Sequence, residues 1–269
     1  MEKINKTTIL SELKRVGVPL LGFIFLFLLY HLPEFLQKHF QKPLILVLEL
    51  GMLLFTIVAF IIGRCWHRNG FRIFGLFSFR KNWGNLIKGL LIGIVIAAVA
   101  NLIPVWFHWS EISIQANGSQ MLLLSLLFAI GTLLPSLAED ILTRGYVRIF
   151  WSEKRDLFWI IPVSAAVYVL NHIFRLGKPD VLLYLFILGL FLMWCYVKTG
   201  TLWLTLGIHW GSNIAYQFFT NLAILKSLKD TGMENYVLAG CYLLGFLLVI
   251  LLQKLNFFTL ERRNGIYQN

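Results

Sequence analysis

The chain has 269 residues, of which 58% are hydrophobic and only 14% are charged, and its mean hydropathy is +0.74. A soluble domain carries about 25% charged residues, so we exclude a soluble globular protein and, more firmly, a disordered one. The net charge of +11 comes from Lys and Arg between apolar segments, without a basic block interleaved with aromatics. This pattern is typical of loop charges that set membrane topology, and it predicts no nucleic-acid partner.

Eight apolar segments, each close to the ~20 residues of a bilayer-crossing helix, follow one another along the chain. They cover residues 16–36, 43–63, 86–107, 120–140, 157–175, 181–197, 201–220 and 235–253. The first has a long apolar run and no small-x-small cleavage site after it, so we expect a retained helix. The pattern predicts an all-α, polytopic transmembrane helical bundle in which residues 1–269 form a single integral membrane domain.

The distribution of the 24 Lys and Arg residues predicts the orientation. With both termini in the cytoplasm, the cytoplasmic segments hold 18 of them and the outside segments hold 6, as the positive-inside rule requires. The outside set is Lys38, Lys42, Arg175, Lys178, Lys226 and Lys229. Because the loops are short, as in bacterial membrane proteins, we expect a protein of the bacterial inner (cell) membrane with both termini cytoplasmic.

The longest cytoplasmic connection covers residues 64–85 and places Phe71, Phe74 and Phe77 among basic side chains. This pattern predicts an amphipathic segment on the inner membrane surface, or else an ordinary basic loop.

The cysteines are isolated from one another and from any histidine at ligand spacing. They are Cys65, Cys195 and Cys241. The sequence therefore indicates neither a disulfide framework nor a cysteine-based zinc site.

Few ionisable groups lie inside the predicted spans. Such groups are the default functional candidates of a membrane protein, because placing them in lipid is costly. The carboxylates are Glu49, Glu139 and Asp140, and the histidines are His172 and His209. All except Glu49 belong to three short polar clusters in the second half of the chain.

The first cluster is the segment 138–145, Ala-Glu-Asp-Ile-Leu-Thr-Arg-Gly. Asp140 and Arg144 are four residues apart on one helix face, so we predict an ion pair between them. Glu139 lies about 100° away around the helix and stays free to face a cavity. The structural alternative is a charge cluster that marks the inner membrane boundary.

The other two clusters each place two polar or aromatic residues one helical turn apart. Tyr168 and His172 share one face of a helix, and His209 and Asn213 share one face of another, beside Gly211, which allows close helix packing. The structural alternatives are a buried histidine bonded to a neighbouring helix, and polar contacts that hold two helices together.

Counting along each helix places the three clusters at a similar depth. At 1.5 Å per residue, Glu139 lies roughly 16 Å from the inner end of its helix, His172 roughly 22 Å, His209 roughly 12 Å and Asn213 roughly 18 Å. Polar groups from three helices in one slab near mid-membrane indicate a site, which needs a water-filled cavity.

The residue types in this slab suit direct hydrolysis of an amide. A glutamate beside a histidine can deprotonate a water molecule, and a histidine with an asparagine can donate hydrogen bonds to an oxyanion. Ser136 and Ser212 lack a nucleophile elbow and Cys195 has no base nearby in the sequence. The sequence therefore favours activated water over an acyl-enzyme.

Together, these motifs resemble the CAAX protease and bacteriocin-processing family of intramembrane endopeptidases, which includes the Ras-converting CAAX endopeptidase. The similar motifs are Glu139-Asp140-x-x-x-Arg144, Tyr168-x-x-x-His172 and His209-x-x-x-Asn213, each on its own late span. The segment 198–203 that leads into His209 is also similar. The resemblance covers roughly residues 120–220, the catalytic core helices, with looser similarity upstream.

The resemblance implies a role for each matching residue. Glu139 would activate water with His172 as its partner, and His209 and Asn213 would stabilise the oxyanion. Asp140 and Arg144 would form the structural ion pair, and Tyr168 would support the site. The chain departs from the family pattern at two of these positions, with Asp140 for the usual second Glu and Tyr168 for the usual Phe.

Members of this family are often called metalloproteases. If zinc is used, Glu139, His172 and His209 are the candidate ligands, and they leave a position open for water. The sequence has no H-E-x-x-H motif. We favour a metal-free glutamate mechanism without a cofactor.

These observations predict a bilayer-embedded endopeptidase with its cavity open to the cytoplasmic side. Its substrate would be a peptide or a membrane-associated protein, prenylated if the host prenylates proteins. The alternative is a non-catalytic scaffold or immunity protein that binds a partner in the same cavity. A transporter with a proton relay is a third interpretation, but the internal symmetry common in transporters is absent.

Overall fold

The computed structural model describes residues 16–41, 45–67, 70–151, 158–229 and 231–258. Nine α-helices are described: α2 (Val18–Phe40), α3 (Ile45–His67), α4 (Phe79–Trp106), α5 (Gly118–Asp140), α6 (Tyr146–Phe150), α7 (Ile160–Asn171), α8 (Pro179–Thr199), α9 (Trp203–Asn221) and α10 (Glu234–Lys254). A π-helical turn, η3 (Ile141–Gly145), joins α5 to α6, and two 3-10 turns are η2 (Gly70–Phe74) and η4 (Ile173–Arg175). The predicted all-α class is confirmed.

The helices form a membrane bundle. Six described segments are long and apolar enough to cross a bilayer: α2, residues 46–65 of α3, α4, the continuous rod from α5 through α6, α8 and α10. Many large apolar side chains on α2, α3, α4, α5 and α10 are exposed, as contact with lipid tails requires. The predicted polytopic helical bundle is therefore confirmed.

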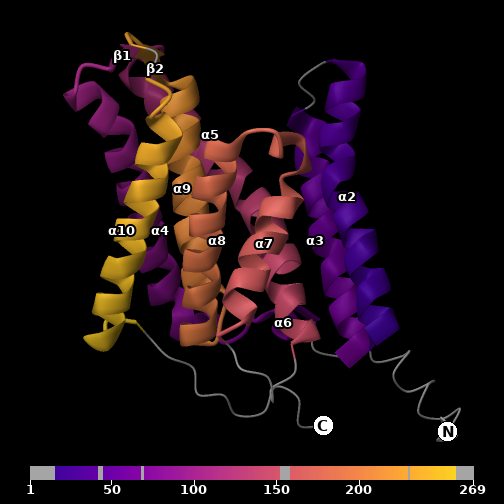
Figure 1. The fold of residues 1–269 in the computed structure, drawn as a ribbon. Coiled ribbons are helices and arrows are strands. Elements are labelled where there is room, and N and C mark those ends of the chain that lie inside the picture. Colours follow the sequence, from indigo (N-terminus) through magenta and orange to yellow (C-terminus); the bar gives the residue numbers. More distant parts are fainter. Residues whose placement is uncertain (1–15, 42–44, 68–69, 152–157, 230, 259–269) are drawn as a thin grey trace, which may run out of the picture.

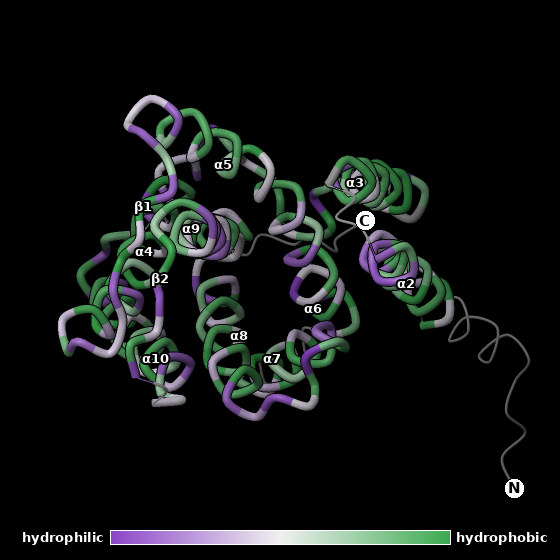
Figure 2. The backbone as a smooth tube through the Cα atoms, turned by 90° about the horizontal axis from the view of Figure 1, so that it is seen from above, coloured by the Kyte–Doolittle hydropathy of each residue, from purple (hydrophilic) through white to green (hydrophobic). Residues whose placement is uncertain are grey.

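The bundle has two distinct ends (Figure 1). Helix α2 begins and α10 ends at one of them. At the other end, β1 (Ser110–Ile114) and β2 (Ala223–Ser227) pair as an antiparallel ribbon, with Ile112 opposite Leu225. Seen from above, the α2–α3 pair lies on one side of the bundle and α4 with α10 on the other, with α7, α8 and α9 between them (Figure 2). Helices α7, α8 and α9 thus lie in the middle of the bundle.

Helices α4 and α9 approach each other closely through small residues. Gly89 and Gly93 on α4 face Gly207 and Gly211 on α9, and a Cβ atom on any of the four would overlap the backbone of the opposite helix. Two such G-x-x-x-G pairs allow the two backbones to pack directly on each other. This contact fixes α9, which carries His209 into the middle of the bundle.

The segment predicted to lie on the membrane surface is instead folded into the bundle. Ile73 and Phe74 are buried, and the Phe74 ring packs 5.2 Å from the Tyr146 ring. The Tyr196 hydroxyl donates a hydrogen bond to the Phe74 carbonyl at 3.1 Å. The surface interpretation was wrong, because η2 turns its apolar side chains towards other helices rather than towards lipid.

Helix α7 is shorter than its predicted span of 157–175. It begins at Ile160 and ends at Asn171, and residue 157 lies outside the described part of the chain. Its 12 residues measure about 18 Å, too little to cross a bilayer. His172 therefore caps the helix instead of lying inside it, and η4 follows. Irregular backbone at such a depth requires protein or a water-filled cavity around it.

Several charges counted in predicting the orientation lie outside the described residues. They are Lys3, Lys6, Lys14, Arg15, Lys42, Arg68, Lys154, Arg155, Arg262 and Arg263.

Candidate active site

The first polar cluster lies where α5 passes into the π-helical turn, a feature often found at functional sites. Asp140 and Arg144 form the predicted ion pair at 2.5 Å, with both side chains fully buried. Arg144 also donates to the Thr143 hydroxyl at 3.0 Å, and the Ser164 hydroxyl donates to the Thr143 carbonyl at 2.8 Å. The turn is thereby tied to α7.

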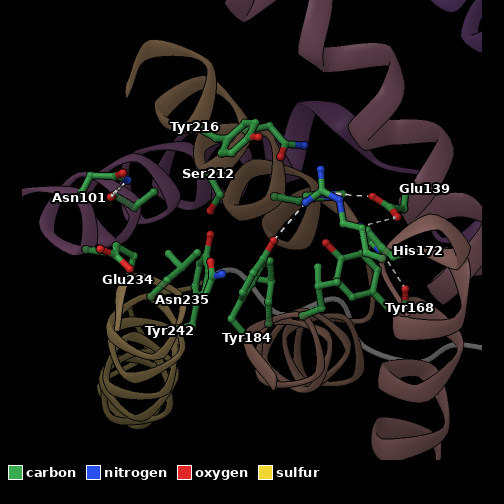
Figure 3. A pocket seen from close by; sticks show the side chains of 18 of the residues that line it. Asn101, Glu139, Tyr168, His172, Tyr184, Ser212, Tyr216, Glu234, Asn235 and Tyr242 are labelled. Carbon is green, nitrogen blue, oxygen red and sulfur yellow. Dashed lines mark hydrogen bonds and ion pairs between the residues drawn. The ribbon is translucent and has the colours of Figure 1, made fainter. Parts of the chain in front are cut away.

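Glu139 lies at the meeting point of three helices. Its Oε1 accepts a hydrogen bond from Asn171 Nδ2 at 2.9 Å and lies 3.7 Å from His172 Nε2, both near the end of α7. Its Oε2 lies 3.4 Å from His209 Nε2 on α9. Figure 3 shows Glu139 and His172 directed towards each other at one end of a pocket. The structure thus brings together one residue from each of the three predicted clusters.

His209 contacts both carboxylates of α5. Its Nδ1 lies 3.0 Å from Asp140 Oδ1, while its Nε2 faces Glu139. The imidazole is almost fully buried, so these contacts fix its orientation. Asp140 is therefore more than the partner of Arg144, because it also holds His209 in place.

Tyr168 supports this cluster through its ring. The ring lies edge-on to His172 at 4.9 Å and to His209 at 5.9 Å, and the Arg144 guanidinium lies over it at 4.4 Å. The His172 Nδ1 is 2.9 Å from the Tyr168 carbonyl. An N–H at Nδ1 that donates to this carbonyl leaves the lone pair on Nε2, which faces Glu139.

Asn213 lies one helical turn beyond His209 on the cavity side of α9. Its Nδ2 donates to the Ser136 hydroxyl at 2.9 Å, and Ser136 donates to the Thr132 carbonyl at 2.6 Å. An amide nitrogen has two N–H groups, so one remains for another acceptor. Asn213 lies in the wall of the same cavity as Glu139 and His209 but has no described contact with either.

A cavity of about 270 Å³ extends away from Glu139, His172 and His209. Its walls come from α4, α8, α9 and α10, and it reaches Leu225 of β2 and Glu234 at the start of α10. A second cavity of about 200 Å³ reaches Glu139 from the side of α2. Glu139 therefore borders two cavities that are large enough to hold water molecules.

The main cavity runs towards the β1–β2 end of the bundle, opposite the end where α2 begins and α10 ends. If the termini are cytoplasmic, this cavity lies towards the opposite face of the membrane. The predicted combination of cytoplasmic termini and a cavity open to the cytoplasm was therefore wrong. Counting residues along a helix gives the depth of a side chain, but it does not tell which half of the bundle is filled with packed side chains. Here Ile141, Leu142 and Tyr146, all fully buried, fill the half nearer the termini.

Two residues near Glu139 had no role in the sequence-based interpretation. Asn171 lies within a predicted span, and its position directly before His172 was a usable signal. Arg175 was counted only as a loop charge, yet it lines both cavities. Its spacing of three residues from His172 would have identified it only if a 3-10 turn had been predicted there.

The candidate zinc ligands do not fit a metal site as they stand. In the described part of the chain, no three His, Cys, Asp or Glu side chains are grouped so that they could hold a metal ion. The Nδ1 and Nε2 atoms of His209 both face carboxylate oxygens. We therefore derive no catalytic step through a metal.

Residues 120–215 match the family model described as Rce1-like, type II CAAX prenyl endopeptidase. The matched segment runs from the first turn of α5 into α9 and contains all the site residues described above. The match confirms the resemblance inferred from the motifs, over the segment that carries the site. No curated protein and no solved structure matches the chain.

Proposed function

We propose that the protein is an intramembrane endopeptidase that hydrolyses a peptide bond with a water molecule activated by Glu139. The observation that carries this proposal is the position of the Glu139 carboxylate, 3.7 Å from His172 Nε2 and 3.4 Å from His209 Nε2 in the wall of a cavity. A base held beside a water-accessible space inside a membrane bundle is what direct hydrolysis requires.

In the proposed reaction, Glu139 and His172 hold a water molecule between them. Glu139 removes a proton from this water as the water oxygen attacks the carbonyl carbon of the substrate. The tetrahedral intermediate then collapses as the C–N bond breaks, and the proton held by Glu139 passes to the leaving amine. A general base at hydrogen-bonding distance contributes typically 10²- to 10⁴-fold to the rate.

His209 and Asn213 stabilise the oxyanion in this proposal. Asp140 holds Nδ1 of His209, and Nε2, 3.4 Å from Glu139 Oε2, is the nitrogen that donates to the oxyanion once Glu139 has taken the proton of the water and no longer attracts it as a carboxylate. Asn213 lines the same cavity one helical turn further along α9, and its amide has a second N–H to donate. Fixed donors of this kind act on the charge that develops in the transition state.

The proposal is metal-free. A histidine whose two nitrogens both donate has no lone pair left for a metal ion, which supports His209 as a donor rather than a ligand. Glutamate and metal mechanisms use the same three residues, so they must be separated by experiment.

The decisive experiment is an assay of the purified protein with a set of fluorogenic peptides. Glu139→Gln keeps the shape of the side chain and removes its basicity, so turnover should fall by at least about 10²-fold. The matched control is Glu49→Gln, which removes a half-buried carboxylate of α3 outside both cavities. Near-normal turnover in Glu139→Gln, or an equal loss in Glu49→Gln, would contradict the assignment.

We further propose that the termini are cytoplasmic and that substrates approach from the opposite face of the membrane. The described charges support this orientation, since Arg64, Arg72, Arg80, Lys81 and Lys254 lie in segments at the terminal end of the bundle.

Cysteine labelling tests the orientation in a variant whose three native cysteines are replaced by alanine. A Gly118→Cys probe, at the β1–β2 end, should react with an impermeant reagent in intact cells. A Lys81→Cys probe should react only after permeabilisation. The reverse pattern would place the cavity mouth in the cytoplasm.

A further inference from the structure

The 3-10 turn after α7 places a cation next to the catalytic cluster. The Arg175 N–H donates to the His172 carbonyl at 2.8 Å, which closes the turn. His172 caps this turn and Arg175 ends it. Both residues line the two cavities that reach Glu139.

No other Lys or Arg of the described residues lines either cavity. Across the described segments, no carboxylate lies within ion-pair distance of Arg175, whose guanidinium donates to the Tyr184 hydroxyl at 3.4 Å and also hydrogen-bonds to Tyr216. It is exposed at the cavity surface, so a ligand can reach it. An arginine without a carboxylate partner is suited to bind an anion through its planar set of N–H donors.

Among the described residues, the opposite end of the same cavity carries a carboxylate and no cation. Figure 3 shows Glu234 and Asn235 across the pocket from Glu139 and His172, with Tyr184 between the two groups. A peptide that lies along the cavity therefore meets Arg175 only at the end that also holds Glu139 and His172. This arrangement favours one direction for a substrate that carries a carboxylate.

We propose that Arg175, with the Tyr184 hydroxyl beside it, binds a carboxylate of the peptide substrate a few residues from the bond that is cleaved. The closeness follows from the shared cavity, since Arg175, His172 and Glu139 all line it. The carboxylate is either the C-terminal one or that of an Asp or Glu side chain. This inference rests on the proposed peptidase function and gives it a substrate class.

The test compares three peptides that share a core sequence whose cleaved bond has been mapped by mass spectrometry. One ends in a free carboxylate a few residues from that bond, the second is its C-terminal amide, and the third is the amide with Asp as its last residue. Wild type should cleave the first or the third about 10- to 100-fold faster than the second, the range of a charge-assisted hydrogen bond. Whichever is preferred identifies the source of the carboxylate.

Arg175→Gln should abolish this preference by slowing only the carboxylate peptides, and Arg175→Lys should keep part of it. Lys178→Gln is the matched control, since it removes a cation from the same loop but outside both cavities. Equal losses on all three peptides in Arg175→Gln, the same change in Lys178→Gln, or no preference in wild type would each overturn the inference.

Binding separates this inference from the proposed function. Dissociation constants of the labelled peptides, measured by fluorescence anisotropy with wild type and Glu139→Gln, should show the same carboxylate preference. If no peptide is cleaved but Arg175→Gln loses a binding preference, the carboxylate site stands and the peptidase proposal fails. If carboxylate and amide peptides bind equally, the carboxylate site is refuted even if cleavage occurs.

Discussion

Glu139 and Asp140 are neighbours in the sequence, yet they lie in opposite surroundings. Asp140 is fully buried in a closed region, where its Oδ1 faces both Arg144 and His209. Glu139 is 6% exposed and borders two cavities, with hydrogen-bonding groups around it but no arginine or lysine within ion-pair distance. One carboxylate is enclosed by fixed partners, and the other retains access to water.

The difference shows how a membrane protein can hold two adjacent charges for different purposes. A charge in the bundle interior needs either a fixed counter-charge or a polar cavity. Consecutive residues on a helix point about 100° apart. Glu139 therefore faces the cavities, while the adjacent Asp140 faces a fixed counter-charge. Mutations in the closed region should therefore act mainly on stability, and mutations in the cavity region mainly on rate.

The largest expected effect lies in the closed region. Asp140→Asn keeps the size of the side chain but leaves Arg144 buried without a counter-charge, which should cost about 3–5 kcal/mol in the free energy of unfolding. The measurement is thermal or denaturant unfolding of the purified protein in detergent.

The control for this variant is Asp140→Asn combined with Arg144→Met, which removes both charges and should regain much of the stability. Activity should also fall, since His209 loses a contact that orients it. A fully stable Asp140→Asn protein without activity would instead place Asp140 in the chemistry and break the comparison.

In the cavity region, Asn213→Ala should leave folding nearly unchanged and reduce turnover. Losing one oxyanion donor costs about 10²- to 10³-fold, roughly 2.7–4 kcal/mol of transition-state stabilisation, with KM little changed. Asparagine is a poor zinc ligand, so the loss in this variant reports on hydrogen bonding.

The activity assay with chelators, together with elemental analysis, decides whether the reaction uses a metal ion. We expect wild type to keep its activity with chelators and to contain no stoichiometric zinc. One zinc per chain, lost together with activity in His209→Ala, would refute the metal-free mechanism and leave the peptidase proposal intact.

Much of the fold can be predicted from the sequence, because the patterns that indicate membrane-spanning helices are local in the chain. Apolar segments of about 20 residues predict helices whatever their neighbours are, and α5, predicted as 120–140, is observed as Gly118–Asp140. The three motifs could also be assigned to separate helices at similar depth, since counting along a helix needs no tertiary information.

The remaining features depend on tertiary contacts that no local pattern reports. Whether Phe74 faces lipid or Tyr146 depends on where η2 folds back, and the apolar pattern of the sequence continues past Asn171, where α7 ends. The second contact of Asp140, with His209, joins residues 69 positions apart in the sequence. The side on which the cavity opens depends on which layers of side chains fill the bundle.

The smallest effect should come from Asn171, which orders the cavity region without taking part in the chemistry. Its Nδ2 holds Glu139 Oε1 at 2.9 Å, so Asn171→Leu, close in size, frees the carboxylate to rotate away from His172. A charge-assisted hydrogen bond is worth about 1.5–3 kcal/mol. Because His172 and His209 still flank the carboxylate, we expect the low end, about a tenfold fall in kcat with KM and melting temperature nearly unchanged.

Asn101→Leu is the matched control, since Asn101 lines the same cavity but donates to the Ala97 carbonyl of its own helix, and it should lower kcat much less. A large loss of stability in Asn171→Leu would show that Glu139, like Asp140, belongs to a closed structural network, and the contrast between the two carboxylates would fail.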